Sequence, residues 1–360
     1  MSDLASILLY LSSFAACALL VYFGQKNNQK LFTILGLLIP ILLCGLWNNV
    51  GIDYNNYVRL FERSNELDYA AFSESNGFWT VEPSFYIFSR ISMFLTGSSW
   101  LLFTIYSSII VVFFFLALKR LKTPYLGMSM FLYLTIYFLF NMSLMRQGAA
   151  ISVSFFAATY LLDKKYLPFI GIVLLASLFH FSALLMLLMI PITAILKRDK
   201  SNLLTIGGIA LVGILIISLP SLIDIVSSLP LFDKYVYLSN KGREEIFIGQ
   251  TFLLQLGIML LCLFLYKKTL RVHREVYLLF PMMLIGIVAY SLNFRINYAS
   301  RLSYYFLISS SVILPYSVSL FKEKHMPLLL LAVMATIYFV KIYYMGASMM
   351  LFPYQFIWES

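Results

Sequence analysis

The residues of this 360-residue chain best suited to chemistry are arginines at or near the ends of apolar runs. They are Arg90, Arg146, Arg295 and Arg301. A guanidinium group binds a phosphate or carboxylate through two parallel hydrogen bonds, a geometry that lysine lacks. Charges at a membrane boundary usually face a cavity or an anionic ligand. The set therefore predicts an anion-binding site. Snorkelling to lipid headgroups, or pairing with Asp53, Glu82 or Asp224, is an open alternative for each arginine.

Arg146 and Gln147 stand in the stretch "NMSLMRQGAAIS", between two apolar runs and with no carboxylate close in sequence. The turn "MRQGAA" places Arg146 near the N-terminus of a helix that we expect at 148–162, where the helix dipole favours an anion. Gln147 can donate a hydrogen bond to a phosphate or a sugar. We expect both side chains to bind the anionic part of a ligand.

Three further residues, Asp53, Glu82 and His180, suit the transfer of a proton or the orientation of a hydroxyl group. Histidine titrates near neutrality, which favours His180 as a general base, although a lone histidine at a helix end is commonly a structural residue. The two carboxylates suit the same role, or they position a sugar or pair with an arginine. The sequence does not rank these alternatives. Only one histidine is predicted on this side, with no carboxylate at ligand spacing, so we expect no metal site.

The elements that must position these residues are membrane-spanning helices. Hydrophobic residues make up 61% of the chain and charged residues only 12%, against roughly 25% charged in soluble domains. Apolar runs recur that are long enough for a helix to cross a hydrocarbon core of about 30 Å. Runs such as "IIVVFFFLALK" lack the alternation of a barrel strand. We therefore predict an all-α polytopic transmembrane bundle of about 12 helices, forming a single integral membrane domain over residues 1–360.

Basic loops set the predicted orientation of these helices. Six short loops hold 12 lysines and 4 arginines against 4 acidic residues, and the positive-inside rule places them in the cytoplasm. The rest of the chain holds 3 lysines and 7 arginines against 12 acidic residues, so the net charge of +10 indicates orientation and not binding of nucleic acid. The expected helices are 4–23, 31–50, 99–118, 124–143, 148–162, 166–179, 182–196, 203–219, 251–266, 276–292, 302–320 and 327–345.

This alternation of sides requires residues 166–196 to turn back as a hairpin of two short helices, with His180 at its outer tip. It also leaves two long outer loops, at 51–98 and 220–250. In the first, "VEPSFYIFSRISMFL" begins a helix at Pro83 that is too short to span and is expected to lie along the membrane interface. The tyrosines of this first loop, including Tyr57, fit a sugar-stacking surface or an interfacial aromatic belt. The second loop fits a mobile lid or an inert solvated loop.

Six motifs follow one another in a recognisable order. They read "GIDYNNYVRLF", "EPSFYIFSR", "NMSLMRQGAAIS", "ASLFHFSALL", "RLSYYFLIS" and a terminal "PYQF". Together, from about residue 50 to 355, they resemble the EpsG family of Wzy-like polymerases of bacterial O-antigen, capsule and exopolysaccharide. Arg146 matches an Arg-Gln motif of that family and Arg301 matches its "R..YYF" motif.

The resemblance implies a glycosyltransferase of the GT-C type in the bacterial cytoplasmic (inner) membrane, with its active site facing the periplasm or the cell-wall side. Such an enzyme transfers a growing glycan from undecaprenyl pyrophosphate onto a lipid-linked oligosaccharide repeat unit. No cofactor or metal is implied. The implied partners are undecaprenyl-pyrophosphate-linked oligosaccharides, membrane lipids, a flippase and, in many systems, a chain-length regulator.

Roles for the candidate residues follow from that chemistry. The leaving pyrophosphate gains negative charge, which fixed arginines stabilise without a metal. We assign pyrophosphate binding to Arg146, Gln147, Arg295 and Arg301, where Arg295 is included by position alone. Sugar contacts are assigned to Tyr57, Arg90 and Tyr304, and the catalytic base is sought among His180, Asp53 and Glu82.

Two other functions fit parts of the same pattern. A transporter or flippase of a lipid-linked or anionic substrate would also line a cavity with arginines, but the two halves show no repeat and the polar residues gather on one side. A membrane acyltransferase would use His180 as its base, with Asn141 nearby. That chemistry leaves the arginines without a role.

Overall fold

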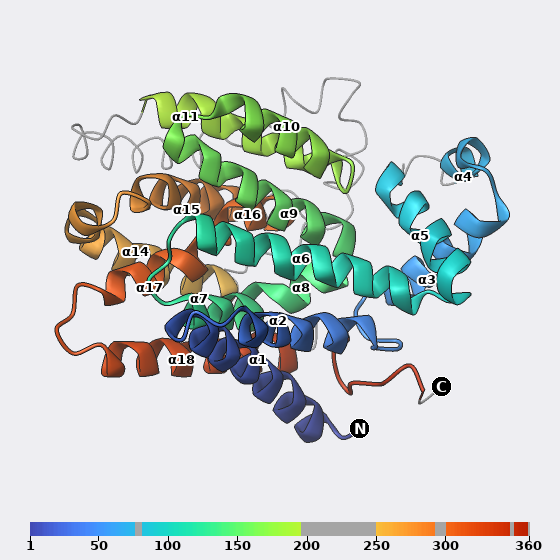
Figure 1. Ribbon diagram of the computed structural model, residues 1–360, viewed down its shortest axis with the longest axis horizontal. Helices are drawn as coiled ribbons and strands as arrows, with labels where there is room; N and C mark the ends of the chain where they lie inside the picture. The colour runs from blue at the N-terminus through green and yellow to red at the C-terminus, as the bar shows by residue number, and fades with distance from the viewer. Residues whose placement is uncertain (76–80, 196–249, 292–299, 346–348, 359–360) are drawn as a thin grey trace. The chain divides into compact units, whose positions relative to one another are not determined.

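The computed structural model describes residues 1–75, 81–195, 250–291, 300–345 and 349–358, whose regular structure is helical apart from one isolated backbone bridge (Figure 1). The chain divides into two compact units. The first unit comprises Met1–Leu187 and Phe321–Ser360, and the second comprises Leu188–Leu320. The all-helical prediction is confirmed for the described residues. The count of about 12 helices stays a prediction, as does the single membrane domain, and the expected helix at 203–219 lies outside the described residues.

Four helical segments among the described residues are long and apolar enough to cross a membrane. They are Asp3–Lys26, Trp100–Arg120, Leu126–Ser143 and His325–Met345. The first two are α1 and α6. The third joins α7 (Leu126–Tyr133), the π-helical η1 (Leu134–Phe138) and α8 (Leu139–Ser143), and the fourth joins α18 (His325–Phe339) and η7 (Val340–Met345). Shorter apolar helices occupy Lys30–Gly45, Tyr166–Ser177, Phe181–Thr193, Phe252–Tyr266 and Val276–Ser291.

In the first unit, the membrane helices pack around an apolar and aromatic core. Helix α1 packs against α2 (Lys30–Gly45) and α7, while α6 packs against α2 and α9 (Met145–Ala158). Helix α10 (Tyr166–Ser177) covers α9. The rings of Phe114 and Tyr133 stack with their centroids 3.8 Å apart, which ties α6 to α7. The Tyr343 hydroxyl donates to the carbonyl of Ile136 at 2.6 Å and so partners a backbone group inside the π-helical turn.

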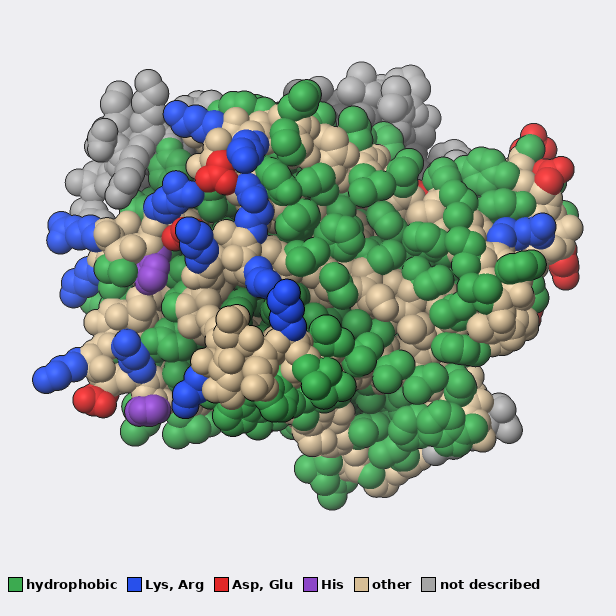
Figure 2. All heavy atoms as spheres, viewed as in Figure 1, with side chains coloured by type: hydrophobic (Ala, Val, Ile, Leu, Met, Phe, Trp, Pro, Cys, Tyr) green, Lys and Arg blue, Asp and Glu red, His purple; other side chains and the backbone are tan. Residues whose placement is uncertain are grey.

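Basic residues mark one end of this helix packing. Arg120, the last residue of α6, pairs with Asp163 at 2.7 Å and lies 3.8 Å from the centre of the Tyr160 ring. Asp163 ends η2 (Thr159–Asp163), which continues α9, so α6 and α9 run in the same direction toward this end. Figure 2 shows Lys and Arg side chains where α6 ends, away from α3, α4 and α5. The first residues of α6 and α9 therefore lie at the opposite end.

The predicted first outer loop is largely helical. It contains α3 (Tyr54–Glu66), α4 (Tyr69–Ser75) and α5 (Pro83–Thr96). Helix α5 begins with Pro83 and has 14 residues, as expected. The sequence analysis gave no helix to α3 because polar residues dominate it. Its buried residues nevertheless recur at helical spacing, at Tyr57, Leu60, Phe61 and Ser64.

The segment at 166–195 breaks where the hairpin tip was predicted. Helix α10 ends at Ser177, residues 178–180 form a turn, and the 3₁₀ helix η3 (Phe181–Leu188) and α11 (Met189–Ile195) follow. His180 lies in this turn, and its N–H donates to the Ala176 carbonyl at 3.2 Å.

The second unit contains α11, α14 (Gln250–Val272), α15 (Val276–Ser291), α16 (Ser300–Leu307) and α17 (Ser310–Val318). Helix α15 packs against α14, α16 and α17. The single helix expected at 302–320 is instead two helices, with a break at residues 308–309. Residues 220–249, nearly all of the second outer loop, lie outside the described residues.

A strap formed by residues 349–358 crosses the end of α2. The Tyr354 hydroxyl donates to the Leu43 carbonyl at 2.7 Å, and the Tyr354 N–H donates to Ser6 Oγ at 2.9 Å. The Asn48 N–H donates to the Gln355 carbonyl at 2.9 Å. Helix α2 ends at Gly45, five residues before the expected end at 50, because the residues after it bond to the strap. This pairing fixes the chain that leads into α3.

Gly148 offers a test of the packing between α8 and α9. A Cβ atom there would lie 2.2 Å from the Asn141 carbonyl oxygen, so we expect Gly148→Ala to lower the free energy of unfolding by about 1–3 kcal/mol. Gly171 in α10 has no neighbour within 4 Å of such an atom. Gly171→Ala should therefore stabilise the protein slightly through helix propensity. Chemical unfolding in detergent measures both variants, and equal stability would contradict this account of the packing.

Candidate functional site

An ion pair between Glu82 and Arg146 lies at the end of the first unit opposite the basic residues around Arg120. Arg146 Nη1 lies 2.5 Å from Glu82 Oε2. The pair is largely removed from solvent, with 19% of the arginine side chain and 14% of the glutamate side chain exposed. Among the described residues, the buried Nε of Arg146 has no hydrogen-bond partner. The guanidinium group is thus held on one side while part of its bonding capacity is unused.

Arg146 reaches this position because the chain breaks just before it. Leu144 has φ −118° and ψ 55°, outside the helical range, and α9 begins at Met145. The break turns the chain from α8 into α9, and Gly148 allows α9 to lie directly against the backbone of Asn141. Arg146 is therefore in the first turn of α9, close to the predicted helix N-terminus.

Glu82 links three segments. It is the residue before Pro83, so it caps α5 by position, without a side-chain hydrogen bond to the helix. Its Oε1 accepts the N–H of Phe181 at 3.3 Å, while Oε2 faces Arg146. The Ser84 N–H also donates to the Leu178 carbonyl at 3.4 Å. Both carboxylate oxygens are therefore engaged, and the 178–181 turn is fixed beside the ion pair.

Tyr57 packs behind the arginine. Its ring is 4% exposed and lies against Phe85 and Phe103, with centroids 5.9 Å and 6.5 Å away. Its hydroxyl forms a side-chain hydrogen bond with Arg146. Burial raises the pKa of Tyr57 to about 12, opposed by Arg146 and reinforced by Asp53, so the hydroxyl is neutral at physiological pH. The expected sugar-stacking face of Tyr57 is buried, and the residue is placed to orient the guanidinium group.

Two further polar residues, Ser84 and Tyr106, lie near the ion pair. The sequence analysis did not identify them. The buried Tyr106 hydroxyl lies 3.2 Å from Ser84 Oγ, within electrostatic range of both Arg146 and Glu82. Ser84 follows Pro83 directly, and Tyr106 is a polar side chain within the apolar helix α6. Both residues are far from Arg146 in sequence, so no local pattern indicated that they lie near it. The only signal was a hydroxyl group inside an apolar stretch.

His180 lies in the turn that Glu82 fixes, and its Nδ1 faces Ser182. The Ser182 N–H donates to Nδ1 at 3.3 Å, and Ser182 Oγ lies 2.7 Å from the same atom. Because Nδ1 accepts a hydrogen bond, the proton of the neutral ring is on Nε2. Nδ1 is thus engaged with Ser182, and the role of His180 as a base stays a prediction. Ser182 is a further residue that the sequence analysis did not identify.

The other candidates in the first unit lie around the ion pair or apart from it. Asp53 directly precedes α3, where it affects Tyr57 electrostatically. Gln147 follows Arg146 in α9 and is only 5% exposed. Arg90 is two helical turns beyond Glu82 along α5, and its Nη1 donates to the Asn65 carbonyl at 3.0 Å. The structure therefore groups Glu82, Arg146, Tyr57 and the His180 turn, and leaves Arg90 outside this group.

The remaining candidates belong to the second unit. Arg301 and Tyr304 lie in α16, where Tyr304 is buried. Arg295 lies outside the described residues. Their predicted roles in binding pyrophosphate and sugar stay predictions.

One family of known proteins matches this chain. The model of the EpsG family matches residues 29–356, nearly the whole chain. The chain belongs to the EpsG family. EpsG proteins are Wzy-like polysaccharide polymerases, so the resemblance noted in the sequence is confirmed. Searches of curated proteins and of solved structures each found no match.

EpsG membership gives the site its general setting. Together with the apolar helices, it indicates a membrane protein of polysaccharide biosynthesis. The family implies a polymerase of the glycosyltransferase type, with lipid-linked oligosaccharides as substrates. Among the described residues, no group of three or more His, Cys, Asp or Glu is arranged to hold a metal ion.

The ion pair predicts a specific pattern of stability. Glu82→Ala leaves a largely buried guanidinium group without its counterion, and should lower the free energy of unfolding by about 3 kcal/mol. Adding Arg146→Met to that variant should restore much of the loss, because the uncompensated charge is removed. The control is Glu62→Ala on the exposed face of α3, which should leave stability unchanged. Additive losses in the double variant would contradict the coupling of Glu82 and Arg146.

Proposed function

We propose that this EpsG protein transfers a growing glycan from undecaprenyl pyrophosphate onto a lipid-linked oligosaccharide repeat unit. The observation that carries the proposal is the Glu82–Arg146 pair, in which Arg146 lies in the first turn of α9 and one guanidinium nitrogen has no partner among the described residues. A polymerase of lipid-linked sugars releases a lipid pyrophosphate at each transfer. A fixed, partly buried arginine at a helix N-terminus suits the negative charge that develops on that group.

Donor binding would exchange the partner of Arg146. The pyrophosphate is a stronger anion than a carboxylate and accepts the paired N–H groups of the guanidinium fork. It would take the place of Glu82 Oε2 and also use Nε. Tyr57 would hold the guanidinium plane during this exchange, since its hydroxyl bonds to Arg146 and its ring is locked by packing.

The displaced Glu82 would then act on the acceptor sugar. Its Oε2 atom would then be available to accept a hydrogen bond from the acceptor hydroxyl group. The acceptor hydroxyl oxygen forms a bond to the anomeric carbon of the donor, and its proton passes to Glu82. The bond between that carbon and the pyrophosphate oxygen breaks, and undecaprenyl pyrophosphate leaves with the electron pair. The turn that carries His180 would lie beside the reacting groups, and Asp53 would position the acceptor.

The wider setting is proposed on the same family basis. The enzyme would be a metal-independent GT-C glycosyltransferase of the bacterial inner membrane, with this site on the periplasmic or cell-wall side. The basic residues around Arg120 would then face the cytoplasm, as the positive-inside rule requires. Gln147 would extend the substrate site. Binding of pyrophosphate by Arg295 and Arg301, and of sugar by Tyr304, is kept as a proposal for the second unit. The product would be an O-antigen, capsule or exopolysaccharide, made with a flippase and a chain-length regulator.

Arg146→Lys tests the arginine. A lysine keeps the charge but loses the planar fork, so we expect the polymerisation rate to fall by roughly 10²-fold or more while the protein still inserts and folds. The control is Arg59→Lys, on an exposed position of α3, which should keep full activity. Polymer of normal amount and length from Arg146→Lys would sink the pyrophosphate role.

Deletion of the gene separates polymerisation from transport. The deletion strain should display single repeat units at its surface, and wild-type protein, but not Glu82→Gln, should restore long chains on a glycan gel. Units trapped as lipid-linked precursors inside the cell would show that the protein transports them instead.

Chelation tests metal independence. Because an arginine stabilises the leaving group in this mechanism, EDTA should leave the rate of purified enzyme unchanged in proteoliposomes with lipid-linked repeat units. A rate lost to EDTA and restored by Mg²⁺ or Mn²⁺ would overturn this part of the proposal.

A further inference from the structure

Helix α5 exposes a row of large apolar side chains on one face. Ile87, Ile91, Phe94 and Leu95 are 52%, 41%, 87% and 63% exposed, and their spacing places them along one side of the helix. The opposite face is buried and includes Phe85. An apolar row this exposed needs a covering that the described residues do not supply.

The position of α5 in the chain indicates what covers that face. After Thr96, only Gly97, Ser98 and Ser99 separate it from α6, which is long and apolar enough to cross the membrane. Gly97 has a positive φ of 66° that suits the sharp corner. Ser92 fixes this corner by donating to the Ser98 carbonyl at 2.7 Å and accepting the Leu102 N–H at 3.0 Å. The end of α5 is therefore held where α6 enters the bilayer.

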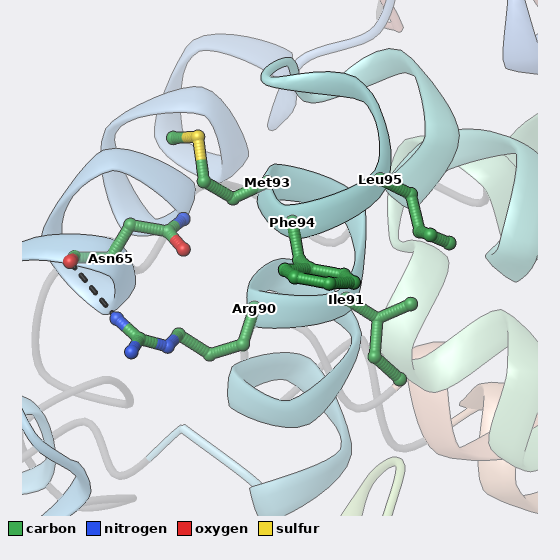
Figure 3. Close-up of a pocket in the computed structure, with 6 residues that line it drawn as sticks. All are labelled: Asn65, Arg90, Ile91, Met93, Phe94 and Leu95. Carbon is green, nitrogen blue, oxygen red and sulfur yellow. Dashed lines mark hydrogen bonds between the residues drawn. The ribbon is translucent and has the colours of Figure 1, made fainter.

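Arg90 gives the same face a charged edge. It lines an open hollow together with Asn65, Ile91, Met93, Phe94 and Leu95. Figure 3 shows its guanidinium group reaching toward Asn65, while Phe94, Ile91 and Leu95 extend on the other side. One nitrogen donates to the Asn65 carbonyl at 3.0 Å. Within the described parts of the chain, Arg90 forms no ion pair with an acidic residue.

We infer that α5 docks into the lipid leaflet beside α6, with Arg90 bound to a phospholipid phosphate. The apolar side chains would contact acyl chains, and the guanidinium group would bind the phosphate at the level of the headgroups. This assignment gives Arg90 a lipid as its ligand in place of a sugar. It goes beyond the proposed function, because docking of α5 requires no catalytic chemistry.

Docking of α5 would also determine where the Glu82–Arg146 pair lies. Glu82 directly precedes α5, and the lipid-facing residues Phe94 and Leu95 lie in its last turn. A helix of 14 residues spans about 20 Å, so a docked α5 sets the position of the Glu82–Arg146 pair relative to the lipid surface. A lipid-linked substrate would then meet the pair without leaving the membrane.

Site-directed spin labelling tests the docking without any assay of activity. The three native cysteines, Cys17, Cys44 and Cys262, are buried, so Phe94→Cys and Glu62→Cys each provide one accessible thiol for a nitroxide label among the described residues. The protein is reconstituted in vesicles of phosphatidylethanolamine and phosphatidylglycerol. Collision rates with oxygen, which concentrates in lipid, and with a water-soluble nickel chelate give the depth of each label.

We expect the label at residue 94 to favour oxygen several-fold more than the label at residue 62. Equal access of the nickel chelate to both labels would overturn the docking. Adding Arg90→Gln to Phe94→Cys should move the label toward water, whereas Arg59→Gln should not. An unchanged depth after Arg90→Gln would overturn the phosphate contact. Because neither result depends on polymerisation, failure here is distinguishable from failure of the proposed function.

Discussion

The contact between Glu82 and Arg146 is the interaction on which the arrangement of the candidate site depends. A guanidinium group with most of its surface removed from solvent requires a counterion, and Glu82 is the carboxylate that the structure brings to it. Because that carboxylate also accepts the Phe181 N–H, one side chain holds α5, α9 and the His180 turn together. The hydroxyl group of Tyr57 restricts the guanidinium orientation further. The site is thus assembled from segments far apart in sequence by a single charge pairing.

The scaffold supports this pairing through local breaks in regular helices. The π-helical turn at Leu134–Phe138 lies inside the apolar segment Leu126–Ser143, and the non-helical Leu144 ends that segment directly before α9 begins. Gly148 then allows close approach of the two segments. A continuous helix through residues 126–158 would carry Arg146 along a membrane span instead of placing it in a first turn. Irregular backbone at this point is therefore what brings a cation to the end of the bundle.

The all-helical character of the described residues was predictable from the sequence because apolar runs indicate helices that can cross a membrane, whereas the orientation inferred from the lysine-rich loops stays a prediction. Pro83 likewise marked the start of α5 correctly. Helix α3 was missed because its apolar residues are few and are interrupted by polar ones. The role of Glu82 as the partner of Arg146 was one of three open alternatives, since 63 residues separate the two and no local pattern selects a carboxylate. The covering of Tyr57 and the hydrogen bonds of His180 arise from tertiary packing, which periodicity does not report.

The strap at residues 349–358 has a consequence for when the site forms during synthesis. The ribosome makes these residues after every helix that contributes to the Glu82–Arg146 site. Until they emerge, the Leu43 and Leu46 carbonyls and the Asn48 N–H lack the backbone and hydroxyl groups that bond to them in the finished structure. The contacts that fix the chain leading into α3, and with it the placement of Tyr57, therefore form only after residues 349–358 have been made. A nascent chain already inserted in the membrane would pass through a period in which the helices that carry Glu82 and Arg146 are present but the contacts of the strap are not.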